Sequence, residues 1–533
     1  MGPKSLNERN AKQFQLDLID EQIDVTTRVF LGVSVACARC HDHKFDPIQQ
    51  RDYYAMAGIF RSTSTHYGTV DSAQNRRPSN EIILPITDAS PFDVELSQSE
   101  ITKLAKAVEA KRKEKTELQT EFRQARREGK TPPPGIQGRI NRVVTAIATL
   151  NRQLNSVDKN GKPISFCMGV QDKPNPTNSR LLIRGEFDQP DKKIPRGIVQ
   201  VLAKKQPKIQ QGSSGRRELA MWISDNDNPL ASRVMINRIW QHLLGEGLVR
   251  SPENFGATGQ FPTHPELLDF LSVQFIKKGW SVKEMIRLIC SSRTYRMSTR
   301  YNSEYFEKDP DNEMLWRANS KQLDAESMRD AMLFACGTID LQRPRASMVA
   351  KAGSTIARDG TIYGVNAKGI VESANMMMQT RAGKQRRNVT LYDVDKQEKH
   401  RSVYLPIVRE GLPRSLEIFD FAEPGLVVGK REKSNTPAQG LYLLNSSFVM
   451  RASEALAKRA IEESSNLESQ IERVFKYCYG RDVYKSELDA AKSFYKNFET
   501  SRRLVRRGKS EKLQKLAALS QAVMISAEFR YIN

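Results

Sequence analysis

The segment Cys37-Ala38-Arg39-Cys40-His41 contains the residues of this chain whose types and spacing most directly suggest a chemical function. In the pattern Cys-x-x-Cys-His, two thiols can attach a haem through thioether bonds while the histidine ligates its iron. The segment therefore predicts a haem c cofactor bound by Cys37, Cys40 and His41. A zinc or iron site without haem, a redox dithiol and a chance arrangement are the other interpretations that the pattern allows.

The residues before this motif predict a helix that would position it. Apolar residues and a threonine recur at steps of three and four from Leu16 to Val33, the pattern of a helix with one face in a protein core. If the helix continues, Cys37 and Cys40 lie on that buried face, which favours a haem or a metal held against a core. Gly32 is the residue at which the helix could instead end.

A second histidine follows the motif closely. His43 is two residues after His41, so on a helix the two imidazole rings would diverge and could not be opposite axial ligands of one iron. His41 and His43 could instead complete a tetrahedral zinc or iron site with Cys37 and Cys40. This metal site is the alternative to covalent haem.

The motif and its surroundings resemble a known protein family. Residues 32–48, 51–55 and 58–63 are similar to the large secreted cytochrome-associated proteins of planctomycetes, whose domains are of unknown function. The resemblance continues over nearly the whole chain in further short blocks, at 216–220, 228–230, 237–242, 254–256, 264–269, 323–326, 329–332, 401–404 and 443–446. It implies a periplasmic or secreted location. Together with the motif, it predicts a cytochrome-like protein that exchanges electrons with a redox partner protein.

Members of that family carry additional segments before the part that corresponds to residues 2–8. These are a signal peptide, often a cytochrome c-like domain, and the first part of the cysteine-motif domain. We therefore expect that this chain is an N-terminally truncated form and that its export depends on the missing segments. The sequence itself shows no signal peptide and no run of about eighteen apolar residues, so it predicts no transmembrane segment.

The chain is strongly basic. Lys and Arg number 84 against 62 Asp and Glu, which gives a formal net charge of +22. Such a charge either serves solubility or attracts a polyanion. No helix-turn-helix, zinc-finger or ribonucleoprotein motif is present, so we expect no nucleic acid partner and predict an anionic polysaccharide instead. With a non-haem or structural cysteine site, the chain would be a polysaccharide-associated binding or processing protein.

Changes of pattern along the chain predict four segments. Residues 1–95 form the C-terminal part of the domain that bears the cysteine motif. Residues 96–157 contain two apolar repeats around a Pro-rich stretch, which predicts an inserted antiparallel helical hairpin. Residues 158–211 predict a small β module, and residues 212–533 predict a mainly helical C-terminal domain. The expected fold class is therefore mainly α with a small β module (α+β), in a multi-domain chain.

The sequence offers few candidate catalytic residues. No serine-hydrolase elbow, zinc-protease helix or dinucleotide fingerprint is present. His242 and His264 lie in two of the family-like blocks and are candidates for an acid–base or metal pair. The other interpretation is that each histidine caps or bridges helices. The carboxylates Asp324, Glu326 and Asp330 are expected to bind neighbouring arginines and not to act on a glycosidic bond.

Overall fold

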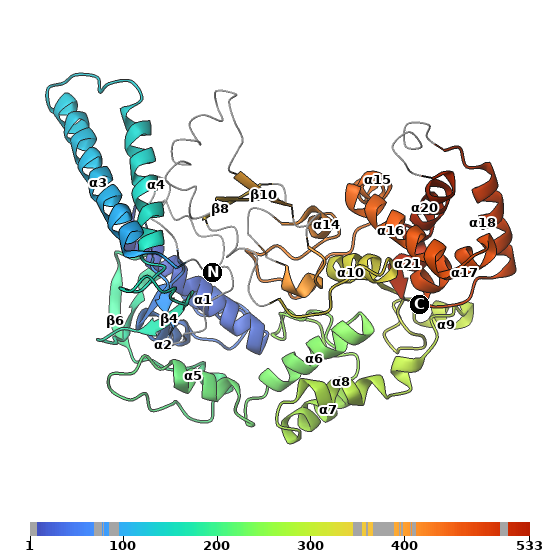
Figure 1. The fold of residues 1–533 in the computed structure, drawn as a ribbon. Helices are drawn as coiled ribbons and strands as arrows, with labels where there is room; N and C mark the ends of the chain where they lie inside the picture. The colour runs from blue at the N-terminus through green and yellow to red at the C-terminus, as the bar shows by residue number, and fades with distance from the viewer. Residues whose placement is uncertain are drawn as a thin grey trace.

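The computed structural model describes residues 8–68, 77, 79–84, 95–344, 354–358, 361–365, 389–393, 395, 398–405, 407, 412–500 and 510–532. Within these residues the fold is mainly helical, with strands confined to small sheets, which confirms the predicted fold class. None of the described helices combines the length and the apolar character that crossing a membrane requires. Figure 1 shows a long helical hairpin at one end of the molecule and a group of C-terminal helices at the other.

Two helices build the core that carries the cysteine motif. α1 (Ala11–Leu31) is capped by Asn10, whose side chain accepts hydrogen bonds from two backbone N–H groups of the first turn. α2 (Gln50–Arg61) packs against α1, and the 3-10 helix η1 (Val35–Arg39) contacts both. These elements share one buried apolar cluster that includes Ile23, Leu31, Val35, Met56 and Ile59.

α3 (Gln98–Arg127) and α4 (Ile136–Leu154) form the hairpin that projects at the upper left of Figure 1. Two small apolar clusters join these helices. One contains Leu118, Ile136, Ile140 and Val143, and the other contains Leu104, Val108 and Leu150. At the base, the backbone N–H of Leu96 donates to the carbonyl of Gly161 at 2.9 Å, so the two ends of the hairpin are adjacent.

Excision of residues 98–158, with a short glycine-serine link between the new ends, is expected to change the melting temperature of the remaining chain by no more than about 2 °C. The reason is that the hairpin packs its apolar side chains mainly between its own helices. Thermal denaturation followed by circular dichroism measures the change. A fall of more than about 10 °C would show that the hairpin is part of a larger core.

Three pairs of short strands lie next to the hairpin in the sequence, and two of these pairs join a strand before it to a strand after it. The pairs are antiparallel and two-stranded: β1 (Thr63–His66) with β4 (Gly169–Asp172), β2 (Ile82–Ile83) with β3 (Phe166–Cys167), and β5 (Ser179–Leu182) with β6 (Pro190–Ile194). The last pair packs on α2. Because β1 and β2 precede the hairpin while β3 and β4 follow it, the predicted segments 1–95 and 158–211 share small sheets.

Asp172, at the end of β4, joins the β module to the helical segment that follows. Its carboxylate accepts hydrogen bonds from Ser214 N at 2.9 Å, Ser214 Oγ at 2.8 Å and Arg216 Nε at 2.9 Å. Partial burial opposes ionisation of this carboxyl, but the donors outweigh burial and lower its pKa.

Asp172→Asn is therefore expected to destabilise the protein by about 1 kcal/mol at neutral pH. The pKa of Asp172 is lower in the folded protein than in the unfolded chain, where it is about 4. The ionised carboxylate therefore stabilises the folded protein above pH 4, and this stabilisation is lost as the pH falls through the pKa of the folded state. The difference between wild type and variant should accordingly shrink when urea denaturation is repeated near pH 3. A difference that does not change with pH would contradict the ionic role of Asp172.

Four helices that follow the β module lie lower than α1 in Figure 1. They are α5 (Arg216–Ile223), α6 (Ala231–Leu244), α7 (Pro265–Lys277) and α8 (Val282–Cys290), and the next helix, α9 (Ser303–Lys308), lies at the right of the figure. α6 contacts α1, α7 and α8, so it links the motif-bearing core to α7 and α8. At the α1–α6 contact, Arg238 Nη2 donates to the carbonyl of Arg28 at 3.2 Å.

The C-terminal helices surround a separate apolar cluster. They are α10 (Ala325–Ala335), α14 (Arg414–Glu417), α15 (Pro437–Asn445), α16 (Ser447–Glu463), α17 (Leu467–Tyr479), α18 (Lys485–Asn497), α20 (Glu511–Met524) and α21 (Ala527–Arg530). Leu456, Val474 and Leu516 are completely buried between α16, α17 and α20.

The remaining elements are short. β7 (Lys321–Gln322) pairs with β11 (Tyr531–Ile532), which brings the end of the chain beside the start of α10. β8 (Ser354–Arg358), β9 (Thr361–Val365) and β10 (Val389–Asp393) form an antiparallel sheet. Further 3-10 turns are η2 (Ile183–Gly185), η3 (Gln200–Leu202), η4 (Thr294–Arg296) and η6 (Ser402–Tyr404).

Candidate functional site

α1 ends before the cysteine motif. The residue after it, Gly32, has a φ of 63°, in the left-handed region, and a Cβ there would come within 2.7 Å of the Phe255 ring. Glycine is therefore required at this point, and the chain leaves the helix axis. The expectation that Cys37 and Cys40 continue the buried face of the helix is wrong, because both cysteines are exposed.

The motif begins on η1 and extends just past its end. In a 3-10 helix, side chains three positions apart lie on the same side. Val35 and Ala38 are three apart and completely buried, so they hold the turn against the core. Cys37 and Cys40 are also three apart, and both present free thiols to solvent.

Hydrogen bonds to the backbone between the two cysteines hold this turn in place. The carbonyl of Arg39 accepts from the hydroxyl of Tyr54 at 3.0 Å and from the side-chain amide of Gln50 at 3.1 Å. Burial raises the pKa of Tyr54 to about 12, so its hydroxyl keeps the proton that it donates. Both donors belong to α2, so this core helix fixes the position of the thiols.

The His41 ring is exposed and makes a defined hydrogen bond. Its Nδ1 lies 2.6 Å from the carbonyl oxygen of Asp42. A carbonyl can only accept, so Nδ1 carries a proton, and in the neutral ring Nε2 is the nitrogen with the free lone pair. Histidines that ligate metals commonly donate their other ring N–H in this way. Cys37, Cys40 and His41 together therefore offer two thiols and one imidazole nitrogen to a haem.

His43 has a different role, because its side chain is only 6% exposed and both ring nitrogens are engaged. Nδ1 accepts from the backbone N–H groups of Phe45 at 3.2 Å and Asp46 at 2.8 Å. Nε2 lies 3.2 Å from Ser34 Oγ. His43 thus fixes the loop after the motif. Within the described ranges, no group of three or more His, Cys, Asp and Glu side chains is arranged to hold a metal ion.

The loop 255–257, far from the motif in sequence, forms hydrogen bonds with residues before and after the motif. Oδ1 of the buried Asp46 carboxylate accepts the backbone N–H of Ala257 at 2.7 Å, while the N–H of Phe255 donates to the carbonyl of Gly32 at 2.7 Å. Asp46 also packs against Gly256, where a Cβ would lie 2.4 Å from the Asp46 Oδ2 atom. No local pattern in the sequence predicts this contact. Only the similarity of residues 254–256 to the family pointed to this loop.

Gly256→Ala is expected to destabilise the protein by about 1–3 kcal/mol, because the new methyl group would push the Asp46 carboxylate away from its hydrogen bond. Urea denaturation measures the change. Gly138→Ala is the matched control, since Gly138 lies in α4 and a Cβ there meets nothing closer than 3.7 Å. Equal effects of the two substitutions would contradict a tight contact between Asp46 and Gly256.

A cleft of about 1110 Å³ extends from the motif toward the C-terminal helices. Its walls come from α1, α6, β7 and the loop 419–433, and they include Ala36 and Cys37. This volume exceeds the range of about 300–1000 Å³ that is usual for small-molecule sites. The cleft is therefore large enough for an extended ligand.

The two candidate histidines lie in different surroundings. His242, in α6, lines the cleft, and partial burial followed by the charge of Lys321 lowers its pKa. His264 is the residue that precedes α7, and its Nδ1 lies 3.0 Å from Thr263 Oγ1. Among the described residues, His264 does not line the cleft. The structure thus brings His242, but not His264, to the cleft that reaches Cys37.

Two models of known protein families match parts of the chain. A model for proteins of unknown function, DUF1553 (PSD1), matches residues 215–495, more than half of the 533 residues. The chain belongs to this family. A second model of unknown function, DUF1549 (PSCyt2), matches residues 2–65, which include the Cys37–His41 motif. Both match the predicted cytochrome-associated family. No curated protein and no solved structure matches the chain.

The DUF1549 and DUF1553 ranges contribute different walls of the cleft. The DUF1549 range contains α1, η1 and the three residues of the motif that could hold a cofactor. The DUF1553 range contains α6 with His242, β7 and the loop 419–433. The cleft is therefore assembled only when both parts of the chain pack together.

The three carboxylates Asp324, Glu326 and Asp330 have structural partners. Glu326 forms two hydrogen bonds with Arg431, at 2.6 and 2.9 Å, and Asp324 caps α10. Asp330 accepts the backbone N–H of Ser402 at 2.8 Å. The prediction that such carboxylates bind arginine is confirmed for Glu326, although the arginine is 105 residues away in the sequence.

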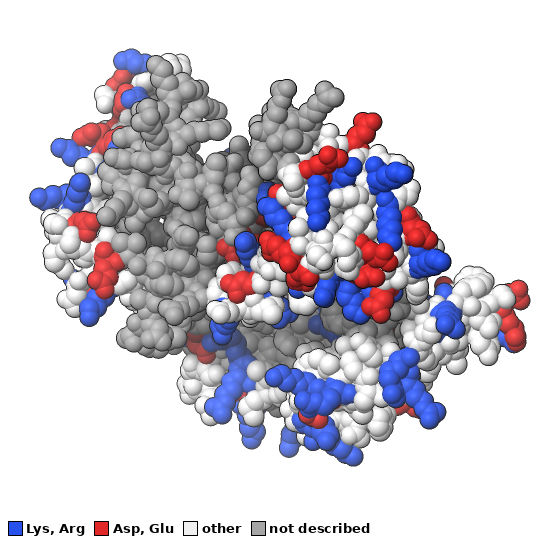
Figure 2. Space-filling view, turned by 45° about the vertical axis from the view of Figure 1, so that its right-hand side comes forward, with Lys and Arg blue, Asp and Glu red and all other residues white. Residues whose placement is uncertain are grey.

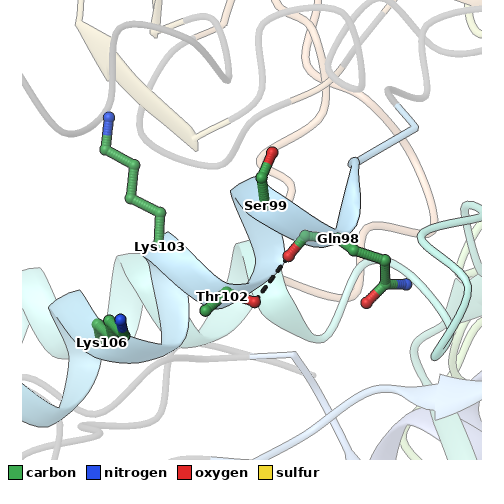
Figure 3. A pocket seen from close by; sticks show the side chains of 5 residues that line it. All are labelled: Gln98, Ser99, Thr102, Lys103 and Lys106. Carbon is green, nitrogen blue, oxygen red and sulfur yellow. Dashed lines mark hydrogen bonds between the residues drawn. The ribbon is translucent and has the colours of Figure 1, made fainter.

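A second hollow, shown in Figure 3, lies on the first turns of α3. Its residues are Gln98, Ser99, Thr102, Lys103 and Lys106. All are exposed and come from one helix, and Thr102 Oγ1 donates to the carbonyl of Gln98 at 2.8 Å. This hollow therefore brings no separate elements together and is not a candidate active site.

Proposed function

We propose that this chain is an extracytoplasmic c-type haem protein that carries electrons. Cys37 and Cys40 would attach the haem, and Nε2 of His41 would ligate its iron. The observation that carries the proposal is the geometry of the motif: two exposed thiols on one turn, beside an imidazole whose free nitrogen is Nε2. When bound, haem supplies one-electron redox chemistry at its iron.

The chain's own residues suit this role in two ways. The buried side chains of Val35 and Ala38, with the hydrogen bonds to the Arg39 carbonyl, keep the thiols at a fixed position. The Asp42 carbonyl sets the tautomer and orientation of His41. The thiols need no conformational change to react, because they are already exposed and unpaired.

The surroundings of the motif also fit a large apolar group. Phe45, which follows the motif, is 57% exposed, and Ile183 is 49% exposed. Ile183 belongs to the turn η2, whose Gly185 lies so close to Cys40 that a Cβ there would be 2.9 Å from the Cys40 sulfur. A haem attached at this turn would cover part of these exposed apolar side chains.

The alternative is a tetrahedral zinc or iron site that uses His43 as the fourth ligand. That site would require His43 to leave its buried position and give up the hydrogen bonds from Phe45 and Asp46. An uncompensated loss of such buried bonds costs about 1–3 kcal/mol each. The hydrogen bonds of His43 therefore favour haem over the four-ligand metal site.

The basic charge of the chain supports a partner with an acidic surface. Figure 2 shows Lys and Arg mixed with Asp and Glu over the right-hand part of one face, and Lys and Arg predominating along its lower edge. For an electron carrier, such a surface suits an acidic redox partner protein, because complementary charge speeds association. An anionic polysaccharide is the second partner that the net charge of +22 supports.

A haem stain after denaturing electrophoresis tests the proposed cofactor. The full chain would be exported to the periplasm of a host that matures c-type cytochromes, because thioether attachment requires that machinery. We expect the 533-residue band to stain, since only covalently attached haem survives denaturation. An unstained band from protein that instead contains one zinc ion per chain would favour the metal alternative and overturn the proposal.

A further inference from the structure

The cleft that reaches Cys37 has a cationic corner around His242. Arg238 lies one helical turn before His242 in α6, and Lys321 of β7 donates a hydrogen bond to the His242 carbonyl. Burial lowers the pKa of Lys321, the carboxylate of Asp324 opposes this, and the charge of Lys433 in the loop 419–433 lowers the pKa further. We call Arg238, His242, Lys321 and Lys433 the cationic corner.

The other cations of the cleft already have carboxylate partners. The pairs are Arg431 with Glu326, Lys430 with Glu246 and Arg28 with Asp24, with separations of 2.6, 2.7 and 2.9 Å. By contrast, neither Lys321 nor Lys433 lies within 4.0 Å of a carboxylate that the structure describes. Nε of Arg238 is buried and makes no hydrogen bond within the described part of the chain.

Like charges gathered in a partly buried cleft repel one another. Burial lowers the pKa values of His242, Lys321 and Arg238, and the neighbouring cations lower that of His242 further. The carboxylate of Asp324 opposes this shift at His242 and Lys321, and that of Glu253 opposes it at Arg238. A bound anion would relieve this repulsion and supply an acceptor for the unpaired donors. The corner is therefore built for a negatively charged group.

The rest of the cleft has a different chemical character. Carboxylates of Asp20, Asp24 and Asp420 line it, together with apolar side chains that include Val25 and Leu426. Each of these carboxylates already has a protein partner, but a carboxylate has about four acceptor positions and can accept a further hydroxyl group. Apolar side chains pack on the C–H faces of sugar rings. This lining suits a ligand with many hydroxyl groups as well as an acid group.

We propose that this cleft binds a segment of an acidic oligosaccharide, with a carboxylate or sulfate group held by the cationic corner and neighbouring sugar rings extending along the carboxylate-lined wall. Ala36 and Cys37 form part of the same cleft, so the bound saccharide lies next to the motif turn. The binding site uses no ligand from Cys40 or His41, and it does not depend on the presence of haem.

Isothermal titration calorimetry of the full chain tests this proposal with three probes. They are three galactose tetrasaccharides that differ only in the terminal unit, which is a galacturonate, its uncharged methyl ester, or a sulfated galactose. We expect a charged oligomer to bind at least about tenfold more tightly than the methyl ester. The better of the two charged probes identifies the acid group. Binding that is equal for all three, or absent for all three, would overturn the proposal.

Single substitutions locate the binding site. Lys433→Gln and Lys321→Gln should each weaken binding of the preferred charged oligomer by about tenfold. Lys433 is exposed, so its substitution carries little risk to the fold. Lys204→Gln is the matched control, because Lys204 is an exposed lysine outside the cleft that pairs with Asp227 at 2.8 Å. Equal weakening by Lys204→Gln would show a general charge effect and overturn the assignment of the corner.

A haem-free form separates this proposal from the function proposed above. The same chain produced without export receives no covalent haem, and it should bind the charged oligomer as tightly as the exported chain. Loss of binding in the unexported chain alone would mean that the anion contacts the haem and not the cationic corner, which would contradict the proposal.

Discussion

The paired variant Cys37→Ser, Cys40→Ser is expected to lose all covalently bound haem, the largest effect that we predict for any substitution. Serine cannot form the thioether bonds, and the exposed turn offers no other thiol at this spacing. Absorbance in the Soret region, measured on protein exported and matured as above, should fall to the level of the apoprotein. A Soret band that is unchanged in the variant would rule out attachment at these residues.

Two further variants make this result specific. Cys290→Ser removes a half-buried cysteine outside the motif and should leave the Soret band intact. His41→Ala should keep the haem attached but shift the spectrum and the reduction potential, because the iron loses the Nε2 ligand. If His41→Ala left both properties unchanged, the iron would have another proximal ligand.

Arg329→Met is expected to lower the free energy of unfolding of the C-terminal helical part by about 3–5 kcal/mol. Arg329 is only 1% exposed, so its charge depends on partners inside the protein. Its guanidinium donates to the carbonyls of His400 at 3.0 Å and Glu398 at 2.7 Å, and to Ser402 Oγ at 3.2 Å. Removal of the guanidinium would leave these acceptors without their donor and would remove the positive charge that lies 3.6 Å from the Asp330 carboxylate.

Urea denaturation followed by circular dichroism measures this effect. Arg329→Lys should be intermediate, because lysine keeps the charge but cannot make the same fork of hydrogen bonds. Arg233→Met is the control, since Arg233 forms a partly exposed ion pair with Asp269 at 2.7 Å and should cost less than about 1 kcal/mol. Similar losses for Arg329→Met and Arg233→Met would contradict a buried organising role for Arg329.

The local features of the site were readable from the sequence. The spacing of Cys37, Cys40 and His41 indicated the possible cofactor, and the apolar period before Gly32 indicated α1. Such features depend on residues close together in the chain. The expectation of a buried motif failed because Gly32 adopts a left-handed conformation against Phe255, a contact between residues more than two hundred positions apart.

The features that assemble the site depend on distant contacts. Asp46 is held by Ala257, and the cleft combines α1 with α6, β7 and the loop 419–433. No local period or motif encodes these pairings, because each is set by how separate elements pack. The role of His43 was likewise hidden, since a histidine two residues from a ligand looks like a second ligand until its hydrogen bonds are known.

Peptide mass spectrometry of the matured full chain is the most direct test of the proposed function. Digestion after denaturation should yield one haem per chain, and we predict that it will be attached to the peptide that contains Cys37, Cys40 and His41. The contradictory result is an unmodified peptide in which both Cys37 and Cys40 react with a thiol reagent, from protein prepared where a control c-type cytochrome is fully matured.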